Sequence, residues 1–428
     1  MEKFFKIKEH GSTPRIEIIA GLTTFMTMAY ILAVNPGILS AAGMPAGGVF
    51  TATALSALIA TLAMALLSNL PIALAPGMGL NAFFAFTVVL TMGYSWQLAL
   101  TAVFLEGIVF ILMSLLNIRE AIVKSIPKNI KSAVSVGIGL FIAFIGLQNA
   151  GIIVNNDATL VSLGSITKGP ALLAIIGLVI TGVLLAFRVK GALLLGILAT
   201  TIVGIPFGIT KIGEGFNPFS MPAAPLLFQF QFDKVLTLDF FVVFFTFLFV
   251  DIFDTIGTLV GVTTQAGLIN KNGEIPKVKQ ALLADAIGTV AGACLGTSTV
   301  TSYVESASGV AEGGRTGLTS LTTAILFGLA LFLSPLFLLV PGAATAPALI
   351  LVGLFMLSPV KDIDLSDFTE AIPAFLTIVM MPLSYSIAEG LVFGILSYIF
   401  LKALSGKLKE IPLVTWIVGA FFILKHLL

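Results

Sequence analysis

Long apolar runs, separated by short polar, Gly- or Pro-containing breaks, recur along the whole chain of 428 residues. A helix that spans a bilayer needs about 20 mostly apolar residues. By this measure we predict about fourteen spans, two of them short (76–91 and 302–312). The others are 16–39, 49–69, 95–116, 130–148, 170–187, 191–210, 239–263, 279–296, 316–340, 344–359, 370–387 and 389–405. A last apolar stretch, 411–428, either spans the membrane, lies in its interface or docks onto the bundle.

The positions of the basic residues give this span count a test, because Lys and Arg gather in cytoplasmic loops. With the N-terminus in the cytoplasm, 18 of the 22 Lys and Arg residues fall on the inner side. Only Lys168, Lys211 and Lys234 fall outside, and Lys425 lies in the unassigned tail. An omitted span would scramble this separation. We therefore expect a multi-pass protein of the cell membrane with a cytoplasmic N-terminus.

Composition narrows the class of protein further. Apolar residues make up 58% and charged residues 10% of the chain, against about 45–50% and about 25% in soluble proteins. The single cysteine, Cys294, and the two histidines, His10 and His426, offer no catalytic triad and no Cys/His metal site in the body of the chain. A net charge of +1 carries no signal for polymeric nucleic acid. We expect no enzyme, no cofactor and no removable signal peptide.

The chain aligns with itself at an offset of 227 residues. The segment that starts at Ala54 then matches the one that starts at Ala281, and Thr24 and Thr27 fall on Asp251 and Asp254. Chance matching of Ala, Leu and Gly would produce a similar identity. The same shift, however, maps an outer loop onto an inner loop, as two copies of seven spans require. We therefore predict an inverted repeat, an architecture that places substrate sites near the bilayer midplane between broken helices.

The two short segments are the predicted breaks. Residues 70–84 contain Pro71 and Pro76 before a Gly-flanked helix start, and residues 295–309 are rich in β-branched and small residues. Each reads as an extended piece followed by a half-helix whose N–H groups face a polar ligand. We expect the two extended pieces to pair, because lipid cannot satisfy their backbone groups.

Carboxylates inside predicted spans are costly and therefore mark candidate functional residues. Asp254 and Glu305 lie at the predicted breaks, where we expect them to bind substrate and carry the coupled proton. Asp251 lies three residues before Asp254 on the same helical face and either shares in proton coupling or tunes it. Asp285 is interpreted as a hydrogen-bond partner of the 297–302 strand, in a supporting network with Asp251, Thr301 and Ser302.

Neutral polar groups complete the predicted binding site. They lie on the first span, on the eighth span and at the two half-helix starts, and comprise Asn81, Thr24, Thr27, Thr258, Gly79 and Ser306. Each Thr has the alternative of bonding back to its own helix. Glu312 and Arg315 form either a gate latch or a capped turn. These groups suit a flat, neutral molecule rich in hydrogen-bonding groups, although a bare cation is an alternative ligand.

Five strings extend this reading to a known family: GLTTFMTMAYILAVNP (21–36), APGMGLNAFFAF (75–86), FVDIFDTIGTLVG (249–261), ADAIGTVAG (284–292) and TSYVESASGVAEGGRTG (301–317). They resemble the AzgA-like purine permeases among the nucleobase–cation symporters. The resemblance implies an all-α membrane fold of fourteen spans in two inverted repeats of seven. It also implies a cytoplasmic tail (1–15), a core domain (16–116 and 239–340), a gate domain (117–210 and 341–405) and a C-terminal tail or interfacial helix (406–428).

The resemblance further implies symport of purine bases (hypoxanthine, guanine or adenine) with protons, by alternating access. Asp254 and Glu305 match the acidic residues that bind the base in this family, and Asn81 and Asp251 match residues that support transport. Uracil carriers have a His where this chain has Thr258, which favours the purine branch. The alternatives are a pyrimidine or xanthine carrier of the same superfamily and a cation channel or facilitator. The choice between H⁺ and Na⁺ and the existence of a homodimer stay open.

Overall fold

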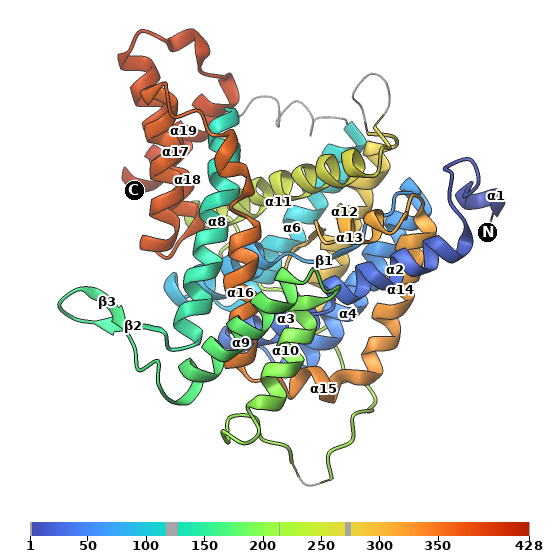
Figure 1. Ribbon diagram of the computed structural model, residues 1–428. Helices are drawn as coiled ribbons and strands as arrows, with labels where there is room; N and C mark the ends of the chain where they lie inside the picture. Colours follow the sequence, from blue (N-terminus) through green and yellow to red (C-terminus); the bar gives the residue numbers. More distant parts are fainter. Residues whose placement is uncertain (1, 117–126, 214, 270–274, 428) are drawn as a thin grey trace.

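The computed structural model describes residues 2–116, 127–213, 215–269 and 275–427, and most of them are helical (Figure 1). Among these residues, ten helical segments are long and apolar enough to cross a membrane: Pro14–Ala41, Ala46–Ser68, Trp96–Leu115, Asn129–Asn149, Gly169–Ala186, Leu238–Gln265, Val278–Leu295, Gly317–Leu338, Gly342–Asp362 and Ile387–Leu404. Three shorter apolar helices accompany them: Met78–Thr91, Ala192–Val203 and Phe368–Leu383.

The elements follow the predicted spans in order. The first half contains α1 (Glu2–Phe5), α2 (Pro14–Met28), α3 (Ile31–Ala41), α4 (Ala46–Ala63), η1 (Met64–Ser68), β1 (Leu74–Pro76), α5 (Met78–Ala82), η2 (Phe83–Thr91), α6 (Trp96–Leu116), α8 (Lys128–Asn149), β2 (Ile153–Asn156), β3 (Leu160–Leu163), α9 (Gly169–Ala186) and α10 (Ala192–Val203). The second half contains α11 (Leu238–Gln265), α12 (Val278–Leu295), β4 (Val300–Ser302), α13 (Ser306–Ala311), α14 (Gly317–Ala330), η3 (Leu331–Leu333), α15 (Ser334–Leu338), α16 (Gly342–Phe355), η4 (Ser358–Asp362), α17 (Phe368–Leu383), α18 (Ile387–Leu404), η5 (Leu408–Glu410) and α19 (Leu413–Leu427).

The two predicted extended pieces do pair. Strands β1 and β4 are antiparallel, with Ala75 opposite Thr301, and each leads into a half-helix, α5 or α13. We call this unit, residues 74–82 with 300–311, the crossing. The pairing, together with the bonds from Gly77 N to Thr299 O at 3.0 Å and from Tyr303 N to Ala73 O at 2.9 Å, satisfies backbone groups of the extended pieces within the protein, as a membrane interior requires. The prediction of paired extended pieces is confirmed.

A threonine on the preceding helix supports the outer edge of each strand of the crossing. Thr61 Oγ1 accepts a hydrogen bond from Leu74 N at 2.9 Å and donates one to Leu74 O at 3.0 Å. Thr289 Oγ1 likewise accepts a hydrogen bond from Val300 N at 3.3 Å and donates one to Val300 O at 3.0 Å. The two halves of the crossing are thus built alike, each from an extended strand held by the helix before it.

The first predicted span is not one continuous helix. Helix α2 ends at Met28 and α3 begins at Ile31, with Ala29 and Tyr30 in a turn between them. Pro36 lies inside α3. The break brings the buried Tyr30 side chain to the crossing, a placement that matters for the site described below.

A β-hairpin that we did not predict joins α8 to α9 and projects from the molecule (Figure 1). Strands β2 and β3 pair with Ile153 opposite Leu163. The Asn156 side chain closes the turn by accepting hydrogen bonds from the backbone N–H groups of Ala158 and Thr159. Asn and Asp at 155–157 were the turn signal available in the sequence.

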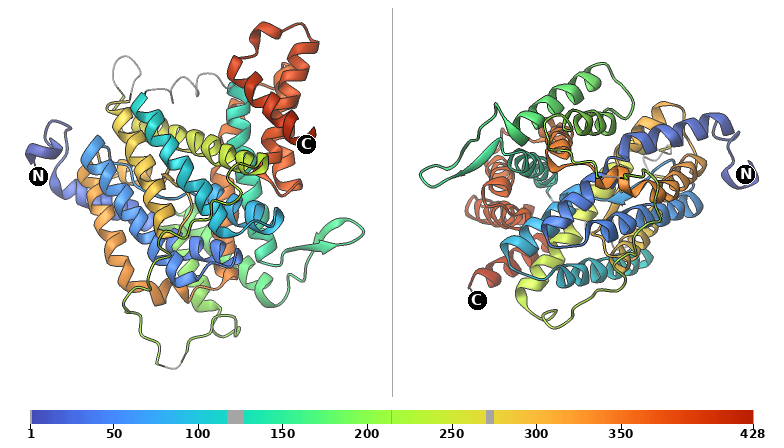
Figure 2. Two further views of the ribbon diagram at one scale, coloured as in Figure 1. Left: turned by 180° about the vertical axis from the view of Figure 1, so that it is seen from behind. Right: turned by 90° about the horizontal axis from the view of Figure 1, so that it is seen from below.

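The C-terminal helices α17, α18 and α19 lie together on one side of the molecule, away from the N-terminus (Figures 1 and 2). Helix α19 docks on the bundle, where Phe422 packs against Phe245 of α11 with their ring centroids 6.1 Å apart. At 15 residues, α19 is shorter than the length of about 20 that a span needs. The helix thus packs on the bundle, and its place relative to the membrane stays a prediction.

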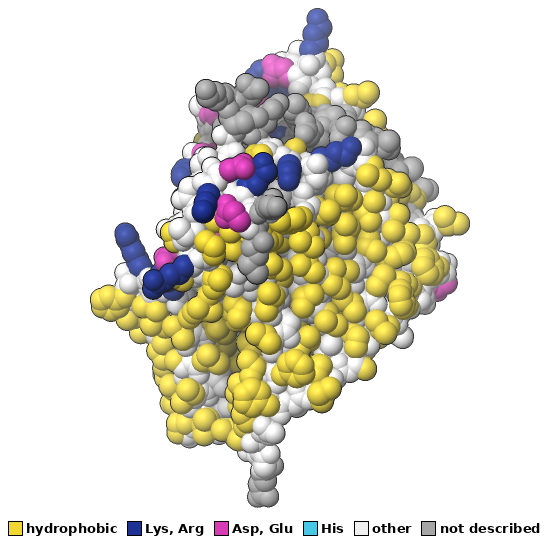
Figure 3. All heavy atoms as spheres, turned by 90° about the vertical axis from the view of Figure 1, so that its right-hand side faces the viewer, with side chains coloured by type: hydrophobic (Ala, Val, Ile, Leu, Met, Phe, Trp, Pro, Cys, Tyr) yellow, Lys and Arg dark blue, Asp and Glu magenta, His cyan; other side chains and the backbone are white. Residues whose placement is uncertain are grey.

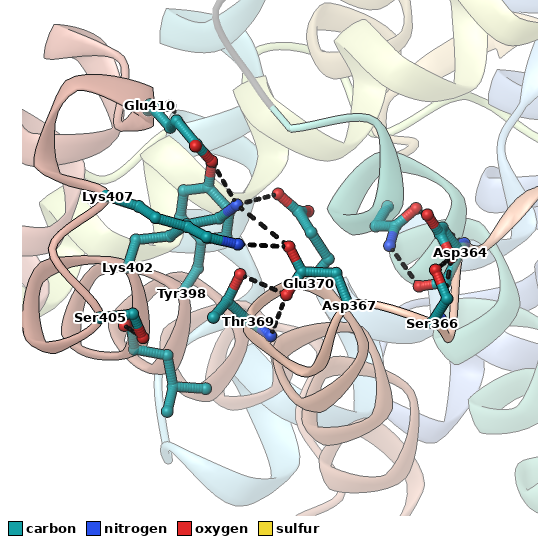
Figure 4. A network of polar contacts seen from close by, with 12 residues as sticks. Asp364, Ser366, Asp367, Thr369, Glu370, Tyr398, Lys402, Ser405, Lys407 and Glu410 are labelled. Carbon is teal, nitrogen blue, oxygen red and sulfur yellow. Dashed lines mark hydrogen bonds and ion pairs between the residues drawn. The ribbon is translucent and has the colours of Figure 1, made fainter.

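An ion-pair network joins the ends of α17 and α18 (Figure 4). The buried Lys402 ammonium pairs with Glu370 at 2.9 Å and with Glu410 at 2.7 Å. Lys407 pairs with Asp367 at 2.7 Å, and Asp367 also accepts a hydrogen bond from Thr369 N at the start of α17. The Lys407 hydrogen bond and those from Thr369 hold the pKa of the Asp367 carboxyl well below its usual range.

The outer surface is strongly apolar. Figure 3 shows a broad face of hydrophobic side chains, with most of the charged side chains gathered toward one end. Exposed apolar residues such as Ile325 and Leu329 of α14 would be unfavourable in water but favourable in lipid. The surface is that of a multi-pass membrane protein.

Candidate functional site

A cavity of about 410 Å³ opens beside the crossing. Its walls come from five segments: the start of α5, the middle of α11, the end of β4 with the start of α13, the first part of α8, and the end of α16 with η4. The volume falls within the range of about 300–1,000 Å³ that is typical of small-molecule sites. Most of the lining is apolar, and its charged members are Lys131, Asp254 and Glu305.

Six of the predicted site residues line this cavity: Gly79, Asp254, Thr258, Thr301, Ser302 and Glu305. Asp254 lies in the middle of α11, where its carboxylate interacts with the Thr301 hydroxyl of β4. Glu305 directly precedes α13. Two segments that are far apart in the sequence thus bring the carboxylates of Asp254 and Glu305 to one cavity, where the two groups interact electrostatically.

Tyr30 holds the Glu305 carboxylate from behind. Its hydroxyl donates a hydrogen bond to Glu305 Oε1 at 2.6 Å, and the Tyr30 side chain is fully buried. Sequence reasoning missed this residue, because one tyrosine in an apolar span reads as core packing. The break between α2 and α3 was the missing information.

Asn81 and Ser306 do not line the cavity; they stabilise the crossing. The Asn81 amide oxygen accepts a hydrogen bond from Ser298 Oγ, and its amide nitrogen donates to Pro76 O at 3.4 Å. Ser306 Oγ accepts a hydrogen bond from Ala73 N at 3.0 Å. Both side chains therefore satisfy backbone or hydroxyl groups where the strands meet the half-helices.

Thr24 and Thr27 belong to α2 and contact α13, and they too lie outside the cavity lining. Thr27 Oγ1 bonds back to its own helix at Thr24 O (2.8 Å) and contacts Ser308 Oγ at 2.8 Å. The buried Thr24 hydroxyl packs against Gly309, where an added Cβ would collide with it. The lack of a side chain at Gly309 thus allows the first span and the second half-helix to approach closely.

Asp251 and Asp285 meet behind the cavity, both fully buried. Thr255 Oγ1 lies 3.2 Å from Asp251 Oδ1 and 2.8 Å from Asp285 Oδ1, so that it links α11 to α12. The Glu106 carboxylate accepts a hydrogen bond from Thr299 Oγ1 of the 297–302 segment at 2.8 Å. Asp285 thus contacts Thr255 of α11, and its interpretation as a hydrogen-bond partner of the 297–302 strand stays a prediction.

Glu312 and Arg315 do not form an ion pair with each other. Glu312 pairs with Lys190 of the α9–α10 turn at 2.6 Å, whereas the Arg315 guanidinium donates to the carbonyls of Val310 and Gly314. Arg315 thus stabilises the turn before α14, which fits the capped-turn alternative. Glu312 contributes a contact between two predicted domains, through a partner that we did not predict.

Two further charged residues escaped the sequence analysis. Lys131, counted there only as an inner-side charge, lines the cavity from α8. Glu17 is fully buried in α2, where its carboxylate accepts hydrogen bonds from the backbone N–H groups of Arg315 and Thr316 at the start of α14. A carboxylate at a helix N-terminus is favourable for the helix, so Glu17 has a structural role.

The apolar surface and the long apolar helices are those of a multi-pass membrane protein, and the family and relatives that the chain matches make it a transporter of the permease class. The chain belongs to the Permease family (Xan_ur_permease), whose profile matches residues 15–393. The family resemblance read from the five strings is confirmed.

Relatives match over nearly the whole chain. The guanine/hypoxanthine permease PbuG of Bacillus subtilis (strain 168) is 47% identical over 435 residues, which cover 99% of each chain. The adenine permease AdeP of Escherichia coli (strain K12) is 45% identical over 427 residues, 99% of this chain and 95% of its own. Among solved structures, the transmembrane domain of the cyanobacterial bicarbonate transporter BicA superposes with a TM-score of 0.67, at 17% identity, over 88% of this chain and 97% of its own. That likeness concerns the fold.

Proposed function

We propose that this protein is a secondary transporter that imports purine bases together with protons across the cell membrane. The observation that carries the proposal is the pair of carboxylates, Asp254 and Glu305, on one cavity beside the crossing. The names of the relatives support a purine base, either adenine or guanine and hypoxanthine.

The chemistry of the cavity suits such a base. A carboxylate accepts hydrogen bonds from ring and exocyclic N–H groups, and the Thr258 hydroxyl adds a group that both donates and accepts. Ile138, Val250 and Phe355 supply apolar walls for a flat ring. Since every purine base offers N–H donors on a planar ring, the class of ligand is better specified than its identity.

The charges of the lining support proton coupling. Its charged members are one cation, Lys131, and two anions, Asp254 and Glu305. With one carboxyl protonated, these three groups carry no net charge. A loaded site without net charge crosses the low-dielectric part of the membrane at lower cost than a charged one. One proton per base is therefore the expected stoichiometry.

Alternating access is supported by where the cavity lies. One wall comes from the predicted core segments 16–116 and 239–340, and the other from the predicted gate segments 117–210 and 341–405. The cavity extends to Lys131 and Pro359, on the side that the positive-inside rule makes cytoplasmic. We interpret this as an inward-facing carrier of fourteen spans in two inverted repeats.

Equilibrium binding to the purified protein tests the substrate assignment, with adenine, guanine, hypoxanthine, xanthine and uracil as probes. We expect a purine to bind, and Asp254→Asn and Glu305→Gln each to weaken it about 10- to 100-fold, because a hydrogen bond to a charged group contributes about 1.5–3 kcal/mol. Asp239→Asn is the matched control, since Asp239 lies on the same helix at its first turn, outside the cavity lining. Wild-type affinity in both site variants would contradict the proposal.

A further inference from the structure

We propose that Tyr30 is a positioning residue for Glu305: its hydroxyl fixes the orientation in which the carboxylate meets the substrate. The inference rests on the proposed function, because it assigns a role within the same site. Its observation is the hydrogen bond from Tyr30 Oη to Glu305 Oε1 at 2.6 Å, between a fully buried phenol and a carboxylate on the cavity wall.

A distance of 2.6 Å lies within the range for a hydroxyl that donates to a carboxyl oxygen. Such a bond is about twice as strong when the carboxyl group is ionised as when both partners are neutral. A buried tyrosine hydroxyl needs a partner, and Glu305 supplies it. Each group therefore restrains the other.

The backbone at Glu305 is held mainly by its own segment of the chain. Glu305 O accepts a hydrogen bond from Ser308 Oγ of α13 at 2.6 Å and has a longer contact of 3.5 Å with Thr27 Oγ1. Thr27 lies at the end of α2, three residues before Tyr30. The side chain of Glu305 is thus oriented by Tyr30, whereas its main chain is fixed by α13.

This arrangement gives the two oxygens of the Glu305 carboxylate different partners. The phenol occupies Oε1 from the side of the broken first span, which leaves Oε2 for a base N–H or a proton from the cavity. The other titratable groups that line the cavity with Glu305 are Lys131 of α8, Asp254 of α11 and Tyr303, which directly follows β4. Tyr303 Oη is engaged with Pro76 O at 2.5 Å, so Tyr30 is the phenol that acts on Glu305.

Tyr30→Phe removes only the hydroxyl, and two readouts test its role. We expect purine affinity to fall about 10-fold or more, and the carboxyl infrared band of Glu305, identified as the band lost in Glu305→Gln, to shift in Tyr30→Phe. In the Glu305→Gln background, Tyr30→Phe should add little further loss, because a residue that acts through another is non-additive with it. Tyr398→Phe is the matched control, a buried tyrosine whose hydroxyl contacts Glu410 O outside the cavity.

The outcomes separate this inference from the proposed function. If the wild type bound no purine, the proposed function would fail, and an unshifted infrared band would overturn the Tyr30 role as well. If the wild type bound a purine and Tyr30→Phe kept both its affinity and the infrared band, only the inference would be overturned. A loss of affinity of equal size in the Glu305→Gln background would show that Tyr30 acts by packing, and would also overturn it.

Discussion

Thr255 has one hydroxyl hydrogen for two buried carboxyl groups. Its oxygen lies within hydrogen-bond distance of both Asp251 and Asp285, yet one hydrogen makes one full bond. The shared hydroxyl of Thr255 therefore links the buried carboxyl groups of α11 and α12 behind the cavity. Asp254 and Glu305, by contrast, line the cavity itself.

Residue types explain which parts of the site were predictable. Asp254 and Glu305 stood out because a carboxylate within an apolar span is rare and costly. Tyr30 and Lys131 did not, because a span tyrosine is ordinary and a lysine near a span end reads as a loop charge. Asn81 was predicted from its chemistry to bind substrate, and the structure turns its amide toward Ser298. Only the fold decides which way such a side chain points.

Asp367 should make stability depend on pH at the acidic end. Its folded-state pKa lies below the ordinary Asp value of about 3.9, so its stabilising effect is present above that value and is lost as pH falls through the folded-state pKa. We expect Asp367→Asn to unfold at a lower temperature than wild type at pH 7, with the gap narrowing below about pH 4. Thermal unfolding in detergent measures this. Asp157→Asn, in the exposed hairpin, is the control.

At the scale of elements, the crossing was the most predictable unit. Prolines at 71 and 76 and the Thr/Ser-rich run before α13 both disfavour helix, and two extended pieces in a membrane have to find backbone partners. The threonines that hold each strand, Thr61 and Thr289, were not predictable, because either could equally bond back to its own helix. We did not predict the β2–β3 hairpin or the break at Tyr30, because the length of an apolar run indicates neither a hairpin between spans nor a break within one.

The Lys190–Glu312 ion pair, at 2.6 Å, joins a segment of the predicted gate domain to a segment of the predicted core domain. The turn that carries Lys190 packs on α2, where an added Cβ at Gly191 would lie 3.0 Å from Met26 O. If the gate and core segments move apart in transport, this pair should favour the observed state. The two side chains are partly exposed, so its contribution is about 0.2–1 kcal/mol.

Charge reversal at Lys190 tests the role of the Lys190–Glu312 ion pair. We expect Lys190→Glu to reduce labelling of the cavity by a few-fold, and the swap Lys190→Glu with Glu312→Lys to restore it. The measurement is the rate at which an impermeant maleimide labels Ser135→Cys, a cavity position, in a Cys294→Ser background. Identical labelling of wild type and Lys190→Glu would show that the ion pair does not influence the equilibrium.

At the scale of the whole molecule, the chain separates its charges from its apolar belt and places one cavity between the two predicted domains. The separation was predictable, because the bilayer imposes it on every span. The position of the cavity was predictable only through the repeat and the family resemblance, since no local pattern indicates that α8 and α16 face the crossing. A site with walls from both domains is the arrangement that alternating access requires.

Accumulation of radiolabelled adenine, hypoxanthine and guanine in proteoliposomes tests the central claim most directly. With an inward proton gradient, we predict that a purine accumulates above its external concentration, and that an uncoupler abolishes the accumulation. Equilibration without accumulation would contradict proton coupling and favour a facilitator or channel. Accumulation driven only by a Na⁺ gradient would show that Na⁺, and not H⁺, is the coupling ion. The absence of any purine flux through folded, inserted protein would contradict the account as a whole.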